Sequence, residues 1–494
     1  MSHIGWIDGG IVGLYLLATM AAGLAVRRYV GGVEDFLLAG REVDVHLGIA
    51  SLAATEFGIV TCMYAAESGY RFGFAGATPG ILMALAMLVV GWTGFCVKPL
   101  REAGVMTLPE LFERRFGARV RRASGVVIVL GGLLNMGVFL RTGGEFLMTV
   151  TGMGAAAAGS GSWAATHRLE LVMTALLLMV AVYTILGGML SVLVTDFLQF
   201  VVMSLGLVAV TCLVLFEIGW APLAATVEER FGPGGFNPFV HPEMGWPYVL
   251  FNAFFNLAVV LTWQTSLQRV MAAKDARTGQ RIYVGTAFFF VCRFLVPGLW
   301  GIAALHVLGA GTPGLTSLNA MPTWLAGFLP VGLMGLLIAA MLAADMSTDS
   351  SYMLTWSSVI YNDVVAPWRL SGWTERKGLL LNRAIVAAIG VFLLFYGLWY
   401  PLRGDLWAYL GITATIYLAS MSTLLVACCY WPRATPRGAA AAIVVGAVFP
   451  VAYLILQQAA PDASAWIGPY WSGVLGYVGS AAAMVAGSLT QEPA

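Results

Sequence analysis

The sequence predicts an all-α, polytopic membrane protein, and three observations support this prediction. Only 10% of the 494 residues are Asp, Glu, Lys or Arg, whereas an ordinary soluble domain has about 25%. Hydrophobic residues make up 59% of the chain, and the mean hydropathy is +0.83. The apolar stretches run unbroken for about 20 residues, the length that a helix needs to cross a bilayer. These features exclude a soluble globular protein, a disordered chain, a coiled coil and a transmembrane barrel.

The charge balance and the reactive residues exclude further classes. A net charge of +1 predicts no nucleic-acid partner. The six cysteines and five histidines show no metal-ligand spacing, and no nucleophile motif precedes a helix. We therefore expect no enzyme active site. The first apolar stretch lacks a basic start and a cleavage site of small residues, so we interpret it as a retained span.

Thirteen stretches are long and apolar enough to cross the membrane. They are expected at residues 7–26, 46–68, 78–97, 124–150, 169–188, 192–217, 248–267, 282–306, 329–360, 381–400, 406–430, 439–459 and 470–488. The short link near Gly187 and Gly188 and the long stretch 329–360 are the least clearly delimited. The outer connections 151–168 and 218–247 are too short to form domains, so we expect residues 1–494 to form a single transmembrane domain.

The basic residues predict the orientation. If the N-terminus is outside, twenty of the 26 Lys and Arg residues fall in cytoplasmic segments, as the positive-inside rule requires. An odd number of crossings then places the C-terminus in the cytoplasm. We expect a multi-pass protein of the cell membrane, surrounded by lipid.

Seven ionisable residues fall inside the predicted spans and away from their ends. A charge at mid-membrane costs about 2.5–3.5 kcal/mol on insertion scales, so such residues indicate a polar path or cavity. They are Glu56, Arg141, Glu145, Asp196, Arg293, Asp345 and Asp349. Arg141 and Glu145 are four residues apart and could simply neutralise each other.

Two segments suggest a cation site. Residues 343–351 place four hydroxyls within about one helical turn, and hydroxyl and carbonyl oxygens suit a hard cation. The alternative is that these hydroxyls bond to their own helix. Residues 51–61 place Glu56 and Gly58 in the middle of a span. A helix that unwinds there would turn free carbonyls toward a cavity.

Four segments, taken in chain order, carry a resemblance to a known family. They are Asp35 to Arg41, Gly187-Gly188 through Thr195-Asp196 to Gln199, Gln268-Arg269 with Ala272 to Arg277, and the helix with Ser347-Thr348. Over about residues 8–430 the chain resembles the sodium:solute symporter family. The resemblance implies a LeuT-type fold, with two inverted five-helix repeats at about 46–217 and 248–430. The spans 7–26, 439–459 and 470–488 would be peripheral.

The resemblance also implies sodium ligands. The common sodium site would use the backbone carbonyls of Ala54, Phe57 and Ala344 with the hydroxyls of Ser347 and Thr348. A second sodium site would use Asp196 with Ser347, Ser350 and Ser351. The chain departs from the family pattern at three acidic residues, and these keep open a proton as the coupling ion. They are Glu56, Asp345 and Asp349.

Five residues are candidates for binding the solute. They are Glu56, Arg141, Trp263, Gln264 and Arg293. An arginine fork suits a carboxylate, and Glu56 could face an ammonium group. The alternatives are ion pairing of Arg141 with Glu145 or Glu56, snorkelling or structural pairing of Arg293, and an interfacial position for Trp263.

These expectations give a sodium-coupled secondary active symporter that works by alternating access. It would import a small, carboxylate-bearing organic solute, either amino-acid-like or a monocarboxylate. The alternatives are a proton-coupled or sugar symporter of the same fold, a transporter-like solute sensor, and, from composition alone, a channel. Its partners would be the solute, sodium ions and membrane lipid, and we expect a monomer or a weak homo-oligomer.

Overall fold

Helices form nearly all of the computed structural model, which describes residues 5–153, 163, 167–368, 374–399 and 406–490. Within these residues, eleven helical segments are long and apolar enough to cross a membrane. One of them, Arg168–Glu217, bends into two crossings, and another, Ile59–Thr93, joins the second half of the predicted second crossing to the third, while Val45–Thr55 supplies the first half of the second crossing. The described residues therefore hold the thirteen predicted crossings. Residue 400, the predicted end of the tenth crossing, lies outside the described residues.

The crossings are of three kinds. Eight are single helices: α1 (Trp6–Ala25), α5 (Thr78–Thr93), α15 (Ala276–Leu308), α17 (Leu333–Val359), α18 (Glu375–Trp399), α19 (Leu406–Tyr430), α20 (Pro436–Ala459) and α22 (Pro469–Leu489). Three are pairs of helices: α3 (Val45–Thr55) with α4 (Ile59–Phe72), α8 (Ala118–Met136) with α9 (Phe139–Val150), and α13 (Gly245–Thr262) with α14 (Gln264–Ala272). The remaining two form the bent helix α11 (Arg168–Glu217).

Shorter helices connect the crossings. They are η1 (Val26–Tyr29), α2 (Val33–Leu38), η2 (Ala39–Arg41), η3 (Gly73–Ala77), α6 (Val97–Glu102), α7 (Leu108–Phe116), α12 (Trp220–Phe231), η5 (Gly232–Gly235), α16 (Ser317–Phe328), η6 (Ile360–Val365), η7 (Ala366–Trp368) and α21 (Pro461–Ile467). In the described part of the chain, a single parallel β-bridge joins Val43 to Ala273.

The bend in α11 separates the fifth crossing from the sixth. Gly188 has φ +52° and ψ −145°, a conformation open to glycine. A Cβ atom there would lie 2.5 Å from the carbonyl oxygen of Phe36, so the bend also lets α2 approach closely. The structure thus places the connection at the predicted glycine pair.

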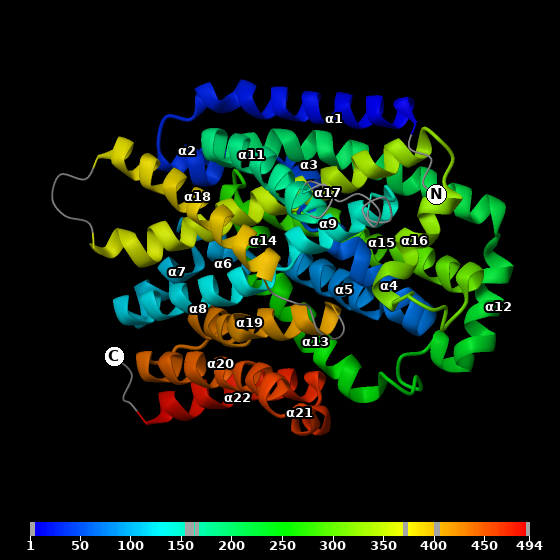
Figure 1. Ribbon diagram of the computed structural model, residues 1–494. Helices are drawn as coiled ribbons and strands as arrows, with labels where there is room; N and C mark the ends of the chain where they lie inside the picture. The colour runs from blue at the N-terminus through cyan, green and yellow to red at the C-terminus, as the bar shows by residue number, and fades with distance from the viewer. Residues whose placement is uncertain (1–4, 154–162, 164–166, 369–373, 400–405, 491–494) are drawn as a thin grey trace.

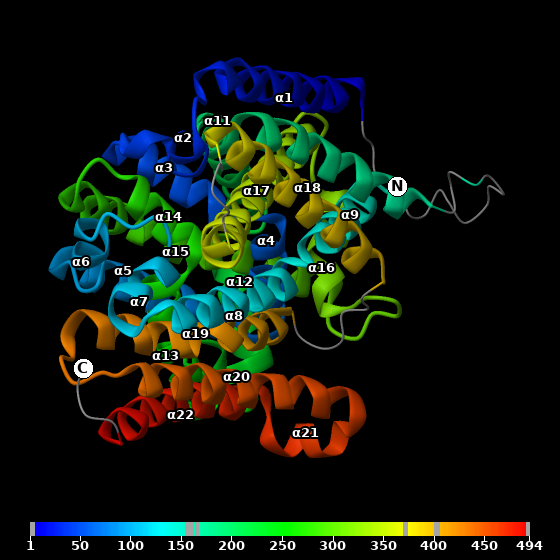
Figure 2. The same ribbon diagram turned by 90° about the vertical axis from the view of Figure 1, so that its left-hand side faces the viewer.

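The helices enclose a buried centre and leave other crossings at the edges (Figures 1 and 2). Helix α17 is buried along almost its whole length. Helix α1 lies at one edge against α11 and α17, whereas α20 and α22 pack together at the opposite edge. The division into two inverted repeats stays a prediction.

The first crossing begins, and the last crossing finishes, at opposite ends of the bundle (Figure 1). Helix α1 begins at the end of the bundle near α12, and α22 finishes at the other end (Figure 1). An odd number of crossings has this consequence. Which end faces the cytoplasm stays a prediction from the distribution of Lys and Arg.

Candidate functional site

The second crossing is broken at its middle, between α3 and α4. Helix α3 ends at Thr55, and α4 begins at Ile59 after the extended residue Gly58. A Cβ atom on Gly58 would lie 2.8 Å from Oγ1 of Thr348, so glycine lets α17 approach the break. The interruption matches the predicted unwinding in residues 51–61, and it leaves carbonyls without helical partners at this depth.

The hydroxyl-rich part of α17 faces this break. Oγ1 of Thr348 donates a hydrogen bond of 3.0 Å to the carbonyl oxygen of Thr55. The five residues expected at the first sodium site are all buried. They are Ala54, Phe57, Ala344, Ser347 and Thr348. The atoms available to a cation here are neutral hydroxyl and carbonyl oxygens, which are the hard ligands that suit sodium.

Asp196 forms a second polar cluster beside the first. Its Oδ1 accepts a hydrogen bond of 2.6 Å from Ser347, and its Oδ2 accepts one of 2.6 Å from Ser51. The guanidinium of Arg269 lies 3.2 Å from Oδ2 and donates to the hydroxyls of Thr55 and Ser351, both at 2.6 Å. The positively charged guanidinium of Arg269 therefore contacts two of the residues expected to bind a second sodium ion, Asp196 and Ser351.

Arg269 was not predicted to belong to the site. Its side chain is fully buried and reaches the cluster from α14. In the sequence, Arg269 belongs to a family motif and counts among the basic residues expected in the cytoplasm. Its neighbour in the motif, Gln268, is also buried and donates to the carbonyl of Leu37. The paired motif Gln268-Arg269 was the sequence signal that could have assigned Arg269 to the site.

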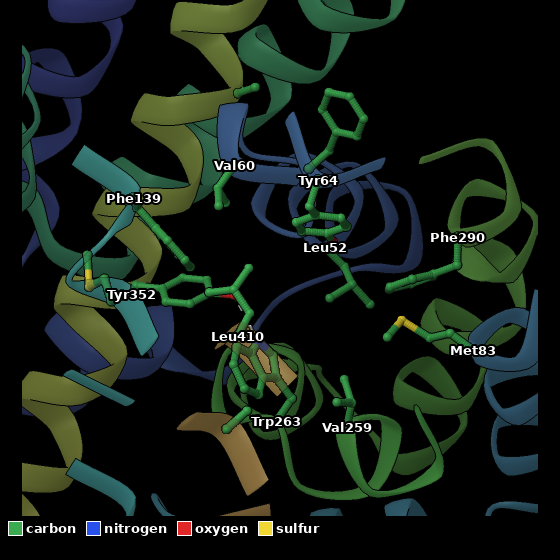
Figure 3. Packing of buried hydrophobic residues seen from close by; sticks show 14 of the residues in the cluster. Leu52, Val60, Tyr64, Met83, Phe139, Val259, Trp263, Phe290, Tyr352 and Leu410 are labelled. Carbon is green, nitrogen blue, oxygen red and sulfur yellow. Dashed lines mark hydrogen bonds between the residues drawn. The ribbon is translucent and has the colours of Figure 1, made fainter. Parts of the chain in front are cut away.

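A central cavity of about 50 Å³ lies next to the break. Six aromatic side chains line it: Tyr64, Phe139, Phe255, Trp263, Tyr352 and Trp407. Figure 3 shows Tyr64, Phe139, Tyr352 and Trp263 around the central space, with Leu410, Val259 and Met83 between them. Most of these rings were not predicted, because an aromatic residue in a span is usually only packing.

Glu56 and Arg293 form an ion pair in the wall of this cavity. Oε2 of Glu56 lies 3.4 Å from Nη1 of Arg293. Oε1 of Glu56 accepts a hydrogen bond of 2.7 Å from Thr265 and one of 3.2 Å from Ser266. Nη2 of Arg293 donates to the Tyr64 hydroxyl at 2.6 Å. The cavity thus presents a negative and a positive group side by side.

The other solute candidates are divided between the cavity and other places. Trp263 lines the cavity and donates to the Tyr352 hydroxyl at 3.1 Å. Gln264 does not line it, and its amide donates to the carbonyl of Thr262. Arg141 also lies outside the cavity lining and is paired with Glu145 at 2.8 Å, which is one of the alternatives considered from the sequence.

Comparison with known proteins decides the family. The model of the "Sodium:solute symporter family" matches residues 36–446. The chain belongs to this family. The predicted fold class and the prediction of a sodium-coupled transporter, and not an enzyme, are thereby confirmed.

Individual relatives of this symporter are distant but cover most of its length. It is 25% identical to "Sodium/glucose cotransporter 4" of Danio rerio, covering 91% of this chain and 72% of the relative. It is 24% identical to "High-affinity proline transporter PutP" of Bacillus subtilis (strain 168), covering 84% of this chain and 85% of the relative. A solved sodium-coupled sialic acid symporter has the same fold, with a TM-score of 0.80, 18% identity and 99% coverage of both chains.

Proposed function

We propose that this symporter uses sodium to import a small zwitterionic, amino-acid-like solute by alternating access. The observation that carries the proposal is the Glu56–Arg293 pair in the cavity wall. A solute with both charges could place its carboxylate at Arg293 and its ammonium group at Glu56. A monocarboxylate would meet a guanidinium that Glu56 already neutralises, so we consider a monocarboxylate a less suitable solute than a zwitterion.

The coupling ion in this proposal binds between the α3–α4 break and α17. Its ligands would be the carbonyls of Ala54, Phe57 and Ala344 with the hydroxyls of Ser347 and Thr348. Support comes from the burial of all five residues and from the bond between Thr348 and Thr55. A solute in the adjacent cavity and an ion at the break would favour the same conformation, which is the condition for coupling.

We propose a single sodium ion in each cycle. The support is Arg269, whose guanidinium contacts Asp196 and Ser351 and so supplies positive charge where the second ion was expected. One charge that crosses 100 mV releases about 2.3 kcal/mol. With a tenfold sodium gradient, one ion can then sustain about a 400- to 600-fold gradient of an electroneutral solute.

A neutral polyol is the second candidate for the solute. Hydroxyl groups can bond to a carboxylate and a guanidinium together, and sugar rings pack well on aromatic side chains such as Tyr64 and Trp407. Relatives of this symporter carry the names of glucose and myo-inositol cotransporters. This candidate does not need charged groups on the solute.

Uptake into proteoliposomes distinguishes the candidates. Radiolabelled amino acids, monocarboxylates and sugars would be offered under an inward sodium gradient, with potassium replacing sodium in the matched control. We expect concentrative, sodium-dependent uptake of an amino acid that other zwitterions inhibit and monocarboxylates do not. Sodium-dependent uptake of sugars alone, unaffected by any carboxylate, would replace the zwitterion with the polyol. Uptake driven by a pH gradient without sodium would refute sodium coupling.

Two arginine variants make the test specific for the cavity. Arg293→Gln should reduce apparent solute affinity at least tenfold, because a charge-assisted contact is worth about 1.5–3 kcal/mol. Arg141→Gln is the matched control, since Arg141 pairs with Glu145 away from the cavity lining. Equal effects of the two substitutions would contradict the proposed solute site.

A further inference from the structure

Asp8, in the helix at the edge of the bundle, contacts the helix that carries the hydroxyl ligands. Its carboxylate is fully buried. Oδ1 accepts hydrogen bonds from the backbone N–H groups of Gly332 and Gly335, both at 2.7 Å. These groups belong to the start of α17, whose N-cap Gly332 has no side chain to satisfy them. Asp8 therefore supplies, from α1, the N-terminal cap that the sequence of α17 lacks.

The backbones of α1 and α17 touch at this point. A Cβ atom on Gly335 would lie 2.5 Å from Cα of Asp8, and one on Gly5 would lie 3.1 Å from Cγ1 of Val331. The carboxylate has no Lys or Arg in ion-pair range within the described residues. The positive end of the α17 dipole takes the place of such a cation.

The other end of α1 is attached to α11. The Ser191 hydroxyl donates to the carbonyl oxygen of Gly23 at 2.9 Å. A Cβ atom on Gly23 would lie 3.0 Å from Oγ of Ser191 and 3.1 Å from Cγ2 of Thr195. Thr195 directly precedes Asp196, which accepts the hydrogen bond from Ser347. The hydrogen bond between Ser347 and Asp196 joins α17 to α11, and α1 therefore contacts both of these helices.

A third contact lies between these two attachments. The hydroxyl of Tyr15, in the middle of α1, donates to Sδ of Met346 at 3.7 Å. Met346 is the residue before Ser347. Figures 1 and 2 show α1 extending along α11 and α17, so the three contacts follow one helix from end to end.

We propose that Asp8 is a positioning residue for sodium binding. By capping α17 it fixes the position of this helix along α1, and α1 holds α11 at its other end. The relative position of Ser347 and Asp196 then depends on a carboxylate that does not touch the ion. This inference rests on the proposed sodium site at the α3–α4 break and assigns a role to a helix outside the predicted repeats.

The test measures sodium binding to the purified full-length protein by its thermal stability. The unfolding temperature would be followed against NaCl, with choline chloride keeping the ionic strength constant. Asp8→Ala should raise the half-effective sodium concentration about five- to tenfold, and Asp8→Asn, which keeps one acceptor oxygen, about two- to threefold. Leu14→Ala is the control, because Leu14 lies in α1 but is 71% exposed, and it should change nothing.

A rescue experiment separates positioning from general damage. Cysteines at Gly5 and Val331 in the Asp8→Ala background, oxidised with diamide, would join α1 to the start of α17. This bond should restore the wild-type sodium response, and reduction should abolish the rescue. If Asp8→Ala does not yield folded protein, Asp8→Asn serves with the same crosslink.

The outcomes distinguish this inference from the proposed function. A wild-type protein whose stability does not respond to sodium would refute the proposed ion site itself. The other outcome is that the wild type responds to sodium and folded Asp8→Ala or Asp8→Asn has a half-effective sodium concentration within twofold of the wild-type value. That outcome would overturn the role of Asp8 and would not contradict the ion site.

Discussion

Glu56 and Arg293 stabilise each other at a depth where either charge alone is costly. Both side chains are buried, and they lie 3.4 Å apart. Removing one member leaves an uncompensated charge, which typically costs about 3–5 kcal/mol. The pair therefore serves the fold as well as the proposed solute site.

A double-mutant cycle tests this dependence. Arg293→Met alone and Glu56→Gln alone should each lower the unfolding temperature more than the double variant does, because only the single variants leave a lone buried charge. Thermal unfolding of the purified proteins measures the three effects. Additive effects would show that the two groups do not interact in the folded protein.

Thr348 offers a second test at the scale of one atom. Thr348→Val removes the hydroxyl and keeps the shape, whereas Thr348→Ser keeps the hydroxyl. We expect the half-saturating sodium concentration for uptake to rise about tenfold in Thr348→Val, equivalent to about 1.4 kcal/mol, and to change little in Thr348→Ser. If the two variants behaved alike, the hydroxyl would not be a sodium ligand.

Among the helices, α11 depends most on one backbone conformation. Gly188 combines a positive φ with a close approach to Phe36. Gly188→Ala should destabilise the protein by more than the about 1–3 kcal/mol of a strained backbone, because the new Cβ would also meet the Phe36 carbonyl. Gly10→Ala is the control, since a Cβ there meets nothing within 4 Å. Thermal unfolding should show a loss for Gly188→Ala alone.

Helix α15 begins with a cap that should make stability depend on pH. Oδ1 of Asp275 accepts a hydrogen bond of 2.7 Å from the N–H of Thr278, and this backbone bond lowers the pKa of the carboxyl below 3.8. The cap therefore stabilises the fold fully above that ordinary pKa and is lost as the pH falls through the lower, folded-state pKa.

The measurement for this cap is thermal unfolding of Asp275→Ala against wild type. At pH 7 the substitution should cost about 1 kcal/mol, and the difference should shrink as the pH approaches 3. Asp275→Asn, which caps without titrating, should keep its stability there. A difference that did not change with pH would contradict the cap.

The break in the second crossing was predictable, because Glu56 and Gly58 interrupt an otherwise apolar span. Contacts between crossings were not. Arg141 and Arg293 look alike in the sequence, yet one pairs along its own helix and the other faces the cavity across to Glu56. Arg269 reaches Asp196 across 73 residues of chain. Only the packing of the helices decides such pairs.

For the whole molecule, hydropathy predicted the number and approximate ends of the crossings, because the bilayer fixes both length and composition. It did not indicate that the first crossing contacts α17, since α1 reads as a helix facing lipid. Asp8 and Tyr15 make the contacts with α17, and Gly23 contacts α11. A peripheral position in the bundle is thus compatible with a role at the site.

The central claim is that one sodium ion binds between the α3–α4 break and α17. Equilibrium binding of radioactive sodium to the purified protein tests it without knowledge of the solute. We predict saturable binding of one ion per chain, displaced by unlabelled sodium and not by potassium, and strongly weakened in Thr348→Val. Binding of two ions per chain, or binding that Thr348→Val leaves unchanged, would contradict the account.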